Sequence, residues 1–435
     1  MKPYPRYNQS SARWYSSFPE NWSEVKAKRL FSNERERASS EDEQLAASQK
    51  YGVIPQALMM AQNNAKVMLA LKGTDNFKQV KENDFVISLR SFEGGIEHSK
   101  YNGCISPAYT VLRLRHESSY PNYFRYALKC SPFIQALNST SEGIRDGKTI
   151  TYDEFGELLV ALPSQAEQKA IATFLDRETQ RIDSLIEEKQ TFIKLLKEKR
   201  QALISHVVTK GLNPNVEMQD SGIEWIGQVP KHWNITSLKS VSTVVDPNPS
   251  HRNPEYVDNG FPFISTKEFT GIDGIELDTL RRVSEDTVIE QEKRCEFREG
   301  SIAFSRKGTI GEVRILPHNI RFALLDSVCV INAGETVSYQ YLYLQAKSSV
   351  YDSQLGAVVR GAALKQVSVG KVRDLLTLCP PIDEQNQIVT YIDQQLEKLD
   401  KLVVETSTSL SLLKERRISL ISAAVTGKID VREAV

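Results

Sequence analysis

The sequence contains few cysteines and no cysteine pair that could form a small metal-binding motif. Its five cysteines lie at positions 104, 130, 295, 329 and 379, each at least 26 positions from the next. Because there is no CxxC pair, a zinc ribbon is not expected, and the odd count argues against a disulfide framework. We therefore expect neither type of small stapled domain.

Long apolar runs are also absent. No hydrophobic stretch approaches the roughly 18 residues that a membrane-spanning helix requires, and the opening MKPYPRYNQ does not resemble a signal peptide. The sequence therefore predicts a soluble, cytoplasmic protein.

Neither sign of charge is in excess. Lys and Arg number 55, and Asp and Glu also number 55, in a chain of 435 residues that is 40% hydrophobic. This balance excludes a histone-like polycation, but it is compatible with a DNA-binding protein whose basic residues gather on one face. The length and the ordinary globular composition predict two or three domains.

Complete catalytic or metal-binding motifs are missing as well. In GIRDGKT (residues 143–149) three residues separate the glycines, whereas a phosphate-binding P-loop has four. Glu187-Glu188-Lys189 contains the ExK pattern of many nucleases, but Lys189 occupies a heptad position of a predicted helix, which favours a helix-face role over a catalytic one. Asp246-Pro-Asn-Pro only partly resembles an amino-methyltransferase motif, and none of the six histidines forms an i, i+4 pair. We expect no catalytic residue and no metal site.

The sequence does contain an internal repeat. Residues 167–209 align without a gap with residues 384–426, at an offset of 217, and many of the identities are polar. The four tryptophans form a second match at an offset of 211, because Trp14 and Trp22 have the same spacing as Trp225 and Trp233. A tandem duplication explains both matches.

The two halves share their ends and differ in their interiors. DFVISLR, AYTVLRLR, FPFISTK, SIAFSR and VCVINAG are short runs typical of strands, whereas YFRYALKC and YQYLYLQAKSSV are typical of helices. Each interior is therefore predicted to be a mixed α/β domain. The fold class is α+β, with two such domains separated by two long helices and related by a pseudo-twofold axis.

The repeated segments at 167–209 and 384–426 predict these helices. Each follows proline, ends before glycine and carries apolar residues at heptad spacing, as in a coiled coil. Since one amphipathic helix cannot bury its own stripe, we expect the two to pair antiparallel; a parallel register would place Leu175 beside Ile392. The predicted boundaries are a first domain at 1–160, a central helix at 161–212, a second domain at 213–377 and a C-terminal helix at 378–435.

Two sets of residues are predicted to form interfaces. The helix and subunit interface comprises Ile171, Leu175, Ile182, Leu185, Phe192, Leu196, Leu203, Ile388, Ile392, Leu399, Leu402, Leu413 and Leu420. The candidate DNA-binding residues are Ser88, Arg90, Ser91, Lys100, Arg113, Arg115, Lys267, Ser305, Arg306 and Lys307. In the second set, Ser88 and Ser305 align in glycine-containing loops, and Arg, Lys and Ser suit phosphates and base edges. For residues outside these loops, a solvated surface position remains the alternative.

The helix openings LPSQAEQKAIATFLD and CPPIDEQNQIVTYID, the segment SGIEWIGQVPKHW and the tandem organisation resemble the specificity subunit of type I restriction–modification enzymes. The resemblance covers nearly the whole chain. It departs from the family pattern at SSARWYSSFPENW, and at the single Pro163 where the second helix has Pro380 and Pro381.

This resemblance implies a subunit that recognises double-stranded DNA and catalyses nothing. Each variable segment would be a target-recognition domain reading one part of an asymmetric site, and the helices would set the spacer. Two modification subunits, which carry S-adenosylmethionine and methylate adenine, would bind to it. Restriction and translocase subunits, which use ATP and Mg²⁺, would join them, and the chain itself would hold no cofactor and bind no membrane.

Three alternatives remain open from the sequence. A self-contained methyltransferase or nuclease would bind S-adenosylmethionine or a divalent metal ion. A tandem coiled-coil scaffold for proteins would lack salt-dependent affinity for DNA. An orphan member of the same family would recognise DNA but have no cognate modification subunit.

Overall fold

The computed structural model describes residues 2–12, 14–63, 76–87, 96–139, 150–248, 254–360 and 366–433. The chain divides into two compact units. The first contains Met1–Gln190 and Thr408–Val435, and the second contains Thr191–Ser407. Each long helix therefore contributes to both units.

The first unit is built around a four-stranded antiparallel sheet. Its strands, in spatial order, are β4 (Phe31–Glu34), β11 (Thr110–Leu114), β8 (Phe85–Ile87) and β9 (Ile96–His98). Two antiparallel strand pairs accompany it, the hairpin of β5 (Leu45–Ser48) with β6 (Gly52–Pro55) and the pair of β7 (Lys78–Val80) with β10 (Gly103–Ile105). The shorter helices of this unit are α1 (Ala27–Leu30), α2 (Gln56–Asn63), α3 (Pro121–Ala127), α4 (Ser131–Ser139) and α5 (Tyr152–Gly156).

The second unit repeats the sheet in the same order. Its strands are β16 (Ser242–Val245), β24 (Val328–Ala333), β21 (Ile302–Ser305) and β22 (Val313–Ile315). It adds a three-stranded sheet of β20 (Arg282–Val283), β17 (Tyr256–Ile264) and β23 (Ala323–Leu324), and a hairpin of β18 (Phe269–Thr270) and β19 (Gly274–Ile275). Its shorter helices are α7 (Leu238–Val241), η3 (Thr266–Glu268), α8 (Glu285–Arg294), α9 (Tyr339–Ala346), α10 (Ser349–Arg360) and α11 (Val369–Arg373).

The central strands are apolar on both faces because each sheet has a core on either side. Successive side chains of a strand point to opposite faces. In β21, Ile302 and Phe304 join one buried cluster while Ala303 joins another. In β8, Phe85 likewise faces away from Val86. This explains why Phe85–Ile87, SIAFSR and VCVINAG lack an alternating polar pattern. The strand predictions are confirmed for SIAFSR, VCVINAG and the described part of DFVISLR.

Paired strands close each domain where it meets the long helices. They are β3 (Ser23–Lys26) with β12 (Leu159–Leu162), and β15 (Asn234–Ser237) with β25 (Leu376–Cys379). Before them stand two further hairpins, β1 (Tyr7–Gln9) with β2 (Ser17–Pro19), and β13 (Met218–Asp220) with β14 (Gln228–Pro230). Strands β1, β2 and β3 correspond to β13, β14 and β15 at the offset of 211 that the tryptophans predicted, whereas β12 and β25 correspond at the offset of 217.

The two long helices are α6 (Gln165–Lys210), with 46 residues, and α12 (Ile382–Val425), with 44. They follow proline residues, and each is followed by a glycine with positive φ, Gly211 at 73° and Gly427 at 71°, as expected at a helix C-terminus. A long helix thus lies at each predicted place, whereas the coiled-coil pairing and the predicted domain boundaries remain predictions. Among the described helices, none is both long and apolar enough to cross a membrane.

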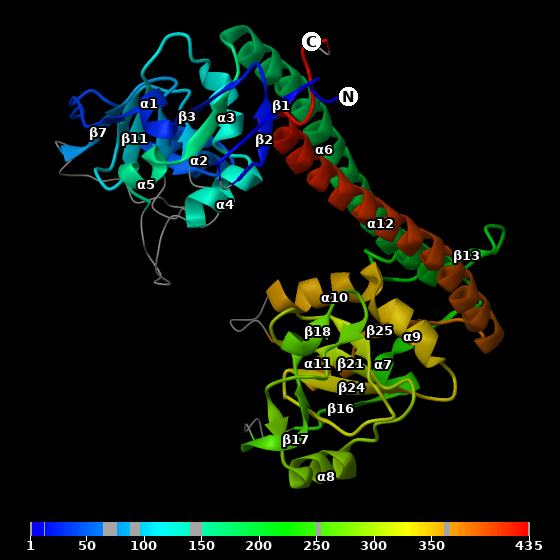
Figure 1. Cartoon of the computed structure of the whole chain (residues 1–435). Helices are drawn as coiled ribbons and strands as arrows, with labels where there is room; N and C mark the ends of the chain where they lie inside the picture. The colour runs from blue at the N-terminus through cyan, green and yellow to red at the C-terminus, as the bar shows by residue number, and fades with distance from the viewer. Residues whose placement is uncertain are drawn as a thin grey trace. The chain divides into compact units, whose positions relative to one another are not determined.

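The helices run antiparallel within each unit, and Figure 1 shows α12 alongside α6. In the first unit Arg417 Nε donates to Asp183 Oδ1 at 2.8 Å, and Ile171 shares a buried cluster with Ile421. In the second unit Arg200 Nη1 lies 3.4 Å from Asp400 Oδ1. The two ion pairs are repeat counterparts, since residues 183 and 200 correspond to 400 and 417.

Candidate functional site

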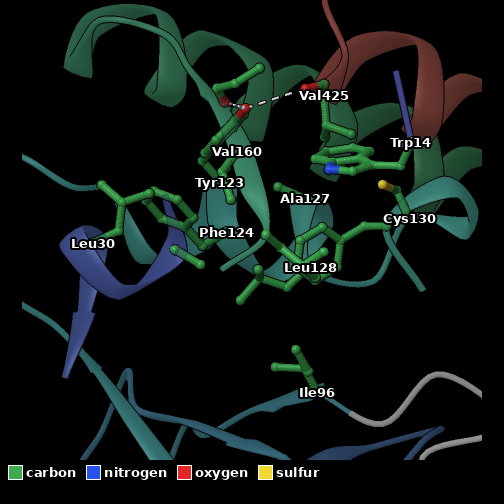
Figure 2. Close-up of a cluster of buried hydrophobic side chains, with 14 of the residues drawn as sticks. Trp14, Leu30, Ile96, Tyr123, Phe124, Ala127, Leu128, Cys130, Val160 and Val425 are labelled. Carbon is green, nitrogen blue, oxygen red and sulfur yellow. Dashed lines mark hydrogen bonds between the residues drawn. The ribbon is translucent and has the colours of Figure 1, made fainter. Parts of the chain in front are cut away.

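One tyrosine in each unit joins the mixed α/β domain to the helix pair. The hydroxyl of Tyr123, on α3, is fully buried and donates to the carbonyl of Val425 at 3.4 Å. Figure 2 shows this bond in the core of the first unit, among Trp14, Phe124 and Cys130. In the second unit Tyr341 Oη donates to the carbonyl of Val208 at 3.3 Å. The contact is therefore preserved in both repeats.

The repeated Glu-Gln at the start of each long helix has a structural role. The Gln168 side chain donates to the carbonyl of Pro163 at 2.9 Å and accepts from the backbone N–H of Tyr120 at 2.8 Å. Gln385 makes the same two bonds, to Pro380 at 2.8 Å and from Ser338 at 2.9 Å. Both amides are buried. They satisfy backbone groups that would otherwise lose hydrogen bonds on burial, and so hold each domain at a helix start.

The predicted loop after β21 is held by a buried ion pair. Arg306 is only 5% exposed. Its Nη2 donates to Asp246 Oδ2 and to the carbonyl of Asp326, both at 2.6 Å, while its backbone pairs with Ser327 and Val367. Arg306 thus joins the ends of β16, β21 and β24 to the segment before α11.

The rest of this loop is shaped by Ser305 and two glycines. Ser305 is buried and donates to the carbonyl of Thr309. Gly308 and Gly311 have φ values of 76° and 91°, which residues with a side chain rarely adopt. Lys307 forms an ion pair with Asp326 and keeps 35% of its side chain exposed. The loop therefore presents Lys307 to solvent on a fixed backbone.

Sequence comparison gives the family of this chain. The family described as "Type I restriction modification DNA specificity domain" matches residues 19–195 and again residues 230–406. The chain belongs to this family. It is a DNA specificity subunit of a type I restriction–modification system, and it carries two target-recognition domains.

Curated relatives with low sequence identity to this chain are named as members of the same family. The type I restriction enzyme EcoBI specificity subunit of Escherichia coli is 22% identical over 339 residues, covering 74% of this chain and 68% of the relative. The putative type I restriction enzyme MjaX specificity subunit of Methanocaldococcus jannaschii is 22% identical over 332 residues, covering 75% and 69%. The relatives are named as specificity subunits, which do not themselves catalyse DNA cleavage or methylation.

Solved structures agree in fold. A chain from a study titled "Structural basis underlying complex assembly and conformational transition of the type I R-M system" has a TM-score of 0.69 at 14% identity, covering 95% of this chain and 99% of that one. The HsdS subunit of Thermoanaerobacter tengcongensis has a TM-score of 0.56 at 16% identity, covering 97% and 100%. The α+β fold of tandem domains is thus confirmed.

The predicted DNA-binding residues of this specificity subunit fall into three groups. Ser88, Arg90 and Ser91 lie outside the described residues. Lys100, Arg115 and Lys267 are exposed and Lys307 is partly exposed, whereas Ser305 and Arg306 are buried. DNA contact by any of them stays a prediction, but the two buried side chains already have partners within the protein.

Arg113 of the specificity subunit is also engaged. Its Nε and Nη2 donate to the two carboxylate oxygens of Asp84 at 2.8 and 2.7 Å, and its Nη1 donates to Glu34 at 3.1 Å. These carboxylates raise the pKa of Arg113 further above its ordinary value, chiefly through the bond to Asp84. The Arg113 guanidinium therefore links the three neighbouring strands β4, β8 and β11 of the sheet.

The predicted helix interface is only partly buried. Seven of its residues are buried: Ile171, Leu175, Ile182, Leu196, Ile388, Ile392 and Leu399. Leu203, Leu413 and Leu420 are half-buried, while Leu185, Phe192 and Leu402 are exposed. Part of the heptad stripe therefore faces away from the helix pair.

Sequence reasoning missed the acidic residues that position the basic ones. The sequence draws attention to Asp246 only through an incomplete methyltransferase-like motif, and it gives Asp84 and Asp326 no particular role. A signal did exist, because each acid lies within two residues of the end of an apolar strand, where a buried charge requires a partner. Among the described residues, no group of His, Cys, Asp and Glu is placed to hold a metal ion.

Proposed function

We propose that this specificity subunit reads an asymmetric two-part DNA site, with one target-recognition domain on each part. The observation that carries the proposal is the repetition of one frame around two different interiors. Both units have the same sheet order and the same Tyr and Gln contacts to the helices, while the second adds β17, β18, β19 and α8. Two domains that differ in this way suit two different base sequences.

In this proposal the two helices act as a ruler. They pair as an antiparallel coiled coil related by a pseudo-twofold axis, and they fix the unread spacer between the half-sites. The antiparallel ion pairs within each unit support this arrangement. Half-sites read from one side of a duplex lie about one helical turn, roughly 34 Å, or a multiple of it apart. A pair of stiff helices meets that requirement better than a flexible linker would.

The exposed basic side chains are the proposed DNA contacts. In the second domain, Lys307 lies on the loop that Arg306 holds in place. The next residue, Gly308, is close to Thr266, because a Cβ placed on Gly308 would lie 3.6 Å from Thr266 Oγ1. Lys267 follows Thr266 in the chain, so the loop of Lys307 lies near the segment that carries Lys267. In the first domain, Lys100 and Arg115 are exposed, and Ser88, Arg90 and Ser91 belong to the aligned loop. Basic side chains bind phosphates or guanine edges, whereas Arg306 and Arg113 position their surroundings.

Replacing Lys307 by Ala tests this assignment. We expect relaxed recognition within one half-site, a loss of about 1–3 kcal/mol per lost base contact, and an unchanged preference in the other half. Sequencing of methylated adenines, in cells that also make modification subunits, would show the change. The matched control is Lys293→Ala, on α8. Equal loss in both half-sites would contradict the proposal.

Two modification subunits are the proposed partners. The first unit exposes Leu185 and Leu412, 37% and 59% accessible. The second exposes their repeat counterparts Leu402 and Leu195, 41% and 54% accessible. Exposed apolar side chains at equivalent positions mark two equivalent protein-binding surfaces. The modification subunits would supply S-adenosylmethionine and methylate adenine, and restriction subunits would supply ATP- and Mg²⁺-dependent cleavage.

Charged substitutions in one unit should remove one partner. We expect the double variant Leu195→Glu, Leu402→Glu to bind one modification subunit where the unaltered chain binds two, because a buried unpaired carboxylate opposes docking. Mass photometry of the purified complex measures the stoichiometry. Leu280→Glu, at a fully exposed leucine outside the long helices, is the control. Retention of two subunits by the double variant would locate docking elsewhere.

A further inference from the structure

The hairpin of β18 and β19 in the second unit has an acidic turn. Asp273 lies in this turn, and 49% of its side chain is exposed. Its carboxylate accepts hydrogen bonds from Tyr343 on α9 and from Lys347, which directly follows α9. Burial raises the pKa of Asp273, but these bonds lower it by more, and the pKa lies below its ordinary value. The carboxylate is therefore charged at neutral pH.

Arg200 on α6 joins this turn to both long helices. Its Nη2 lies 3.6 Å from Asp273 Oδ2, and its Nη1 lies 3.4 Å from Asp400 Oδ1 on α12. The Arg200 side chain is 13% exposed, and a guanidinium can bind two carboxylates at once because its donors form a fixed fork. The contact of the hairpin with α6 and α12 thus depends on the charge of Asp273.

The backbone of the turn is attached to the main sheet of the domain. Arg314, in the middle of β22, is 5% exposed. It donates to the carbonyls of Gly271 and Gly274, each at 3.1 Å, and its guanidinium lies 5.0 Å from the centre of the Phe269 ring. Both ends of the turn are therefore tied to the four-stranded sheet, so that the domain moves together with Asp273.

The hairpin contact is distant from another attachment of this domain to the helices. Gln385, which accepts from the backbone N–H of Ser338, lies near the start of α12, and Asp400 follows it by 15 positions. That length of helix spans about 22 Å. Two attachments this far apart oppose rotation of the domain about either one. The Asp273 contact therefore restricts the angle at which the domain meets the helices.

The first unit joins its domain to the helices by a different ion pair. Arg125 on α3 pairs with Asp176 on α6, whereas Arg417, the repeat counterpart of Arg200, donates to both carboxylate oxygens of Asp183. The cation that joins domain and helix there lies on α3, the counterpart of α9. In the second unit the carboxylate comes from the β18–β19 hairpin, which belongs to the interior in which the two units differ. The second interior thus supplies its own contact to the helix pair.

We propose that Asp273 is a positioning residue, which holds the second domain at one angle to the helix pair and so narrows the range of spacers that the chain accepts. This inference rests on the proposed ruler and assigns part of its precision to a hairpin of the interior. One base pair adds about 3.4 Å to the length of a duplex. A small rotation of the domain about a single attachment is enough to move its reading surface by that distance.

Two spin labels measure the angle without DNA. They are attached to the full chain at Lys293→Cys on α8 and Gln394→Cys on α12, both exposed positions. Cys379→Ser removes the one partly exposed cysteine, since the other four are buried. We expect a narrow distribution of distances, which Asp273→Asn should widen by at least about 3 Å, the rise of one base pair, because asparagine keeps the shape of the side chain and loses its charge.

Selection of bound duplexes from a library with variable spacers measures the consequence for DNA. The preference of the full chain for its best spacer, over spacers one base pair longer or shorter, should fall at least about threefold in Asp273→Asn, the effect of one partly exposed charge pair. The half-site sequences should stay the same. Asp278→Asn is the matched control, because Asp278 is 95% exposed and pairs with Arg282 beyond the hairpin. It should change neither measurement.

Tyr343→Phe gives a second variant that removes one hydrogen bond to Asp273 and keeps the ring. It should act in the same direction as Asp273→Asn with a smaller effect, and it decides the matter if Asp273→Asn does not fold. An unchanged distribution of distances overturns the proposal, as does a wider distribution with an unchanged spacer preference. An unaltered chain that shows no spacer preference would contradict the ruler instead, and the label distances would still test the Asp273 contact.

Discussion

Removing one matched heptad from both long helices is expected to abolish methylation of the original site and to favour a shorter spacer. The deleted segments are residues 193–199 of α6 and 401–407 of α12, which lie opposite each other by the numbering of the Arg200–Asp400 ion pair. Seven residues shorten a helix by about 10 Å, which corresponds to about three base pairs. Affinity for the original site should fall at least about 100-fold, because one domain then misses its half-site.

The deleted segments include Leu195 and Leu402, which the proposal places in a modification-subunit surface. The spacer is therefore measured by DNA binding of the chain itself, through selection of bound duplexes from a library with variable spacers. Both half-site sequences should persist in the selected duplexes, with about three base pairs fewer between them. That shortening also turns the second half-site by about 100° around the duplex, so binding should remain weaker than normal. Exchanging each deleted heptad for its repeat counterpart keeps the length and serves as the control. Altered base preference with an unaltered spacer would rule out the ruler.

Loss of the Asp246 carboxylate is expected to destabilise the second unit strongly. In an Asp246→Ala variant the buried guanidinium of Arg306 loses the carboxylate with which it forms its ion pair. Breaking a buried ion pair lowers the free energy of unfolding by about 3–5 kcal/mol. Chemical denaturation followed by hydrogen exchange of residues 302–331 would measure the free energy of unfolding. The first unit should be unaffected.

A matched acid on the surface provides the comparison. Asp374 pairs with Lys239, and both side chains are more than half exposed, so Asp374→Ala should leave the free energy of unfolding almost unchanged. A combined Asp246→Leu, Arg306→Met variant should recover much of the lost stability, since apolar replacement of a buried pair is often neutral. If Asp246→Ala were as stable as Asp374→Ala, the Arg306 ion pair would not hold this loop.

The repeat made much of the frame predictable from sequence. A 43-residue match with polar identities locates both helices because helix periodicity and punctuation are local properties of the chain. The sheet order of each domain was not predictable, since β4, β11, β8 and β9 pair across long sequence separations. The extra β17–β20 sheet and the β18–β19 hairpin likewise depend on tertiary packing.

The candidate site was predictable by residue type but not by orientation. Arg306 and Lys307 are adjacent basic residues in one loop, yet one is buried against Asp246 and the other reaches solvent. Their alternation follows from the end of β21, where neighbouring side chains point to opposite sides. The sequence showed the charges, whereas the buried acids that decide between the two roles lie about 20 and 60 positions away.

The repeated anchoring of each domain has a consequence for inheritance. Tyr123 and Gln168 in one half, and Tyr341 and Gln385 in the other, attach different interiors to the same helical frame through the same bonds. A genetic crossover within the stretches encoding α6 or α12 would therefore join any two compatible interiors without disturbing a core. New pairs of half-sites could arise in a single recombination event, with no intermediate that fails to fold.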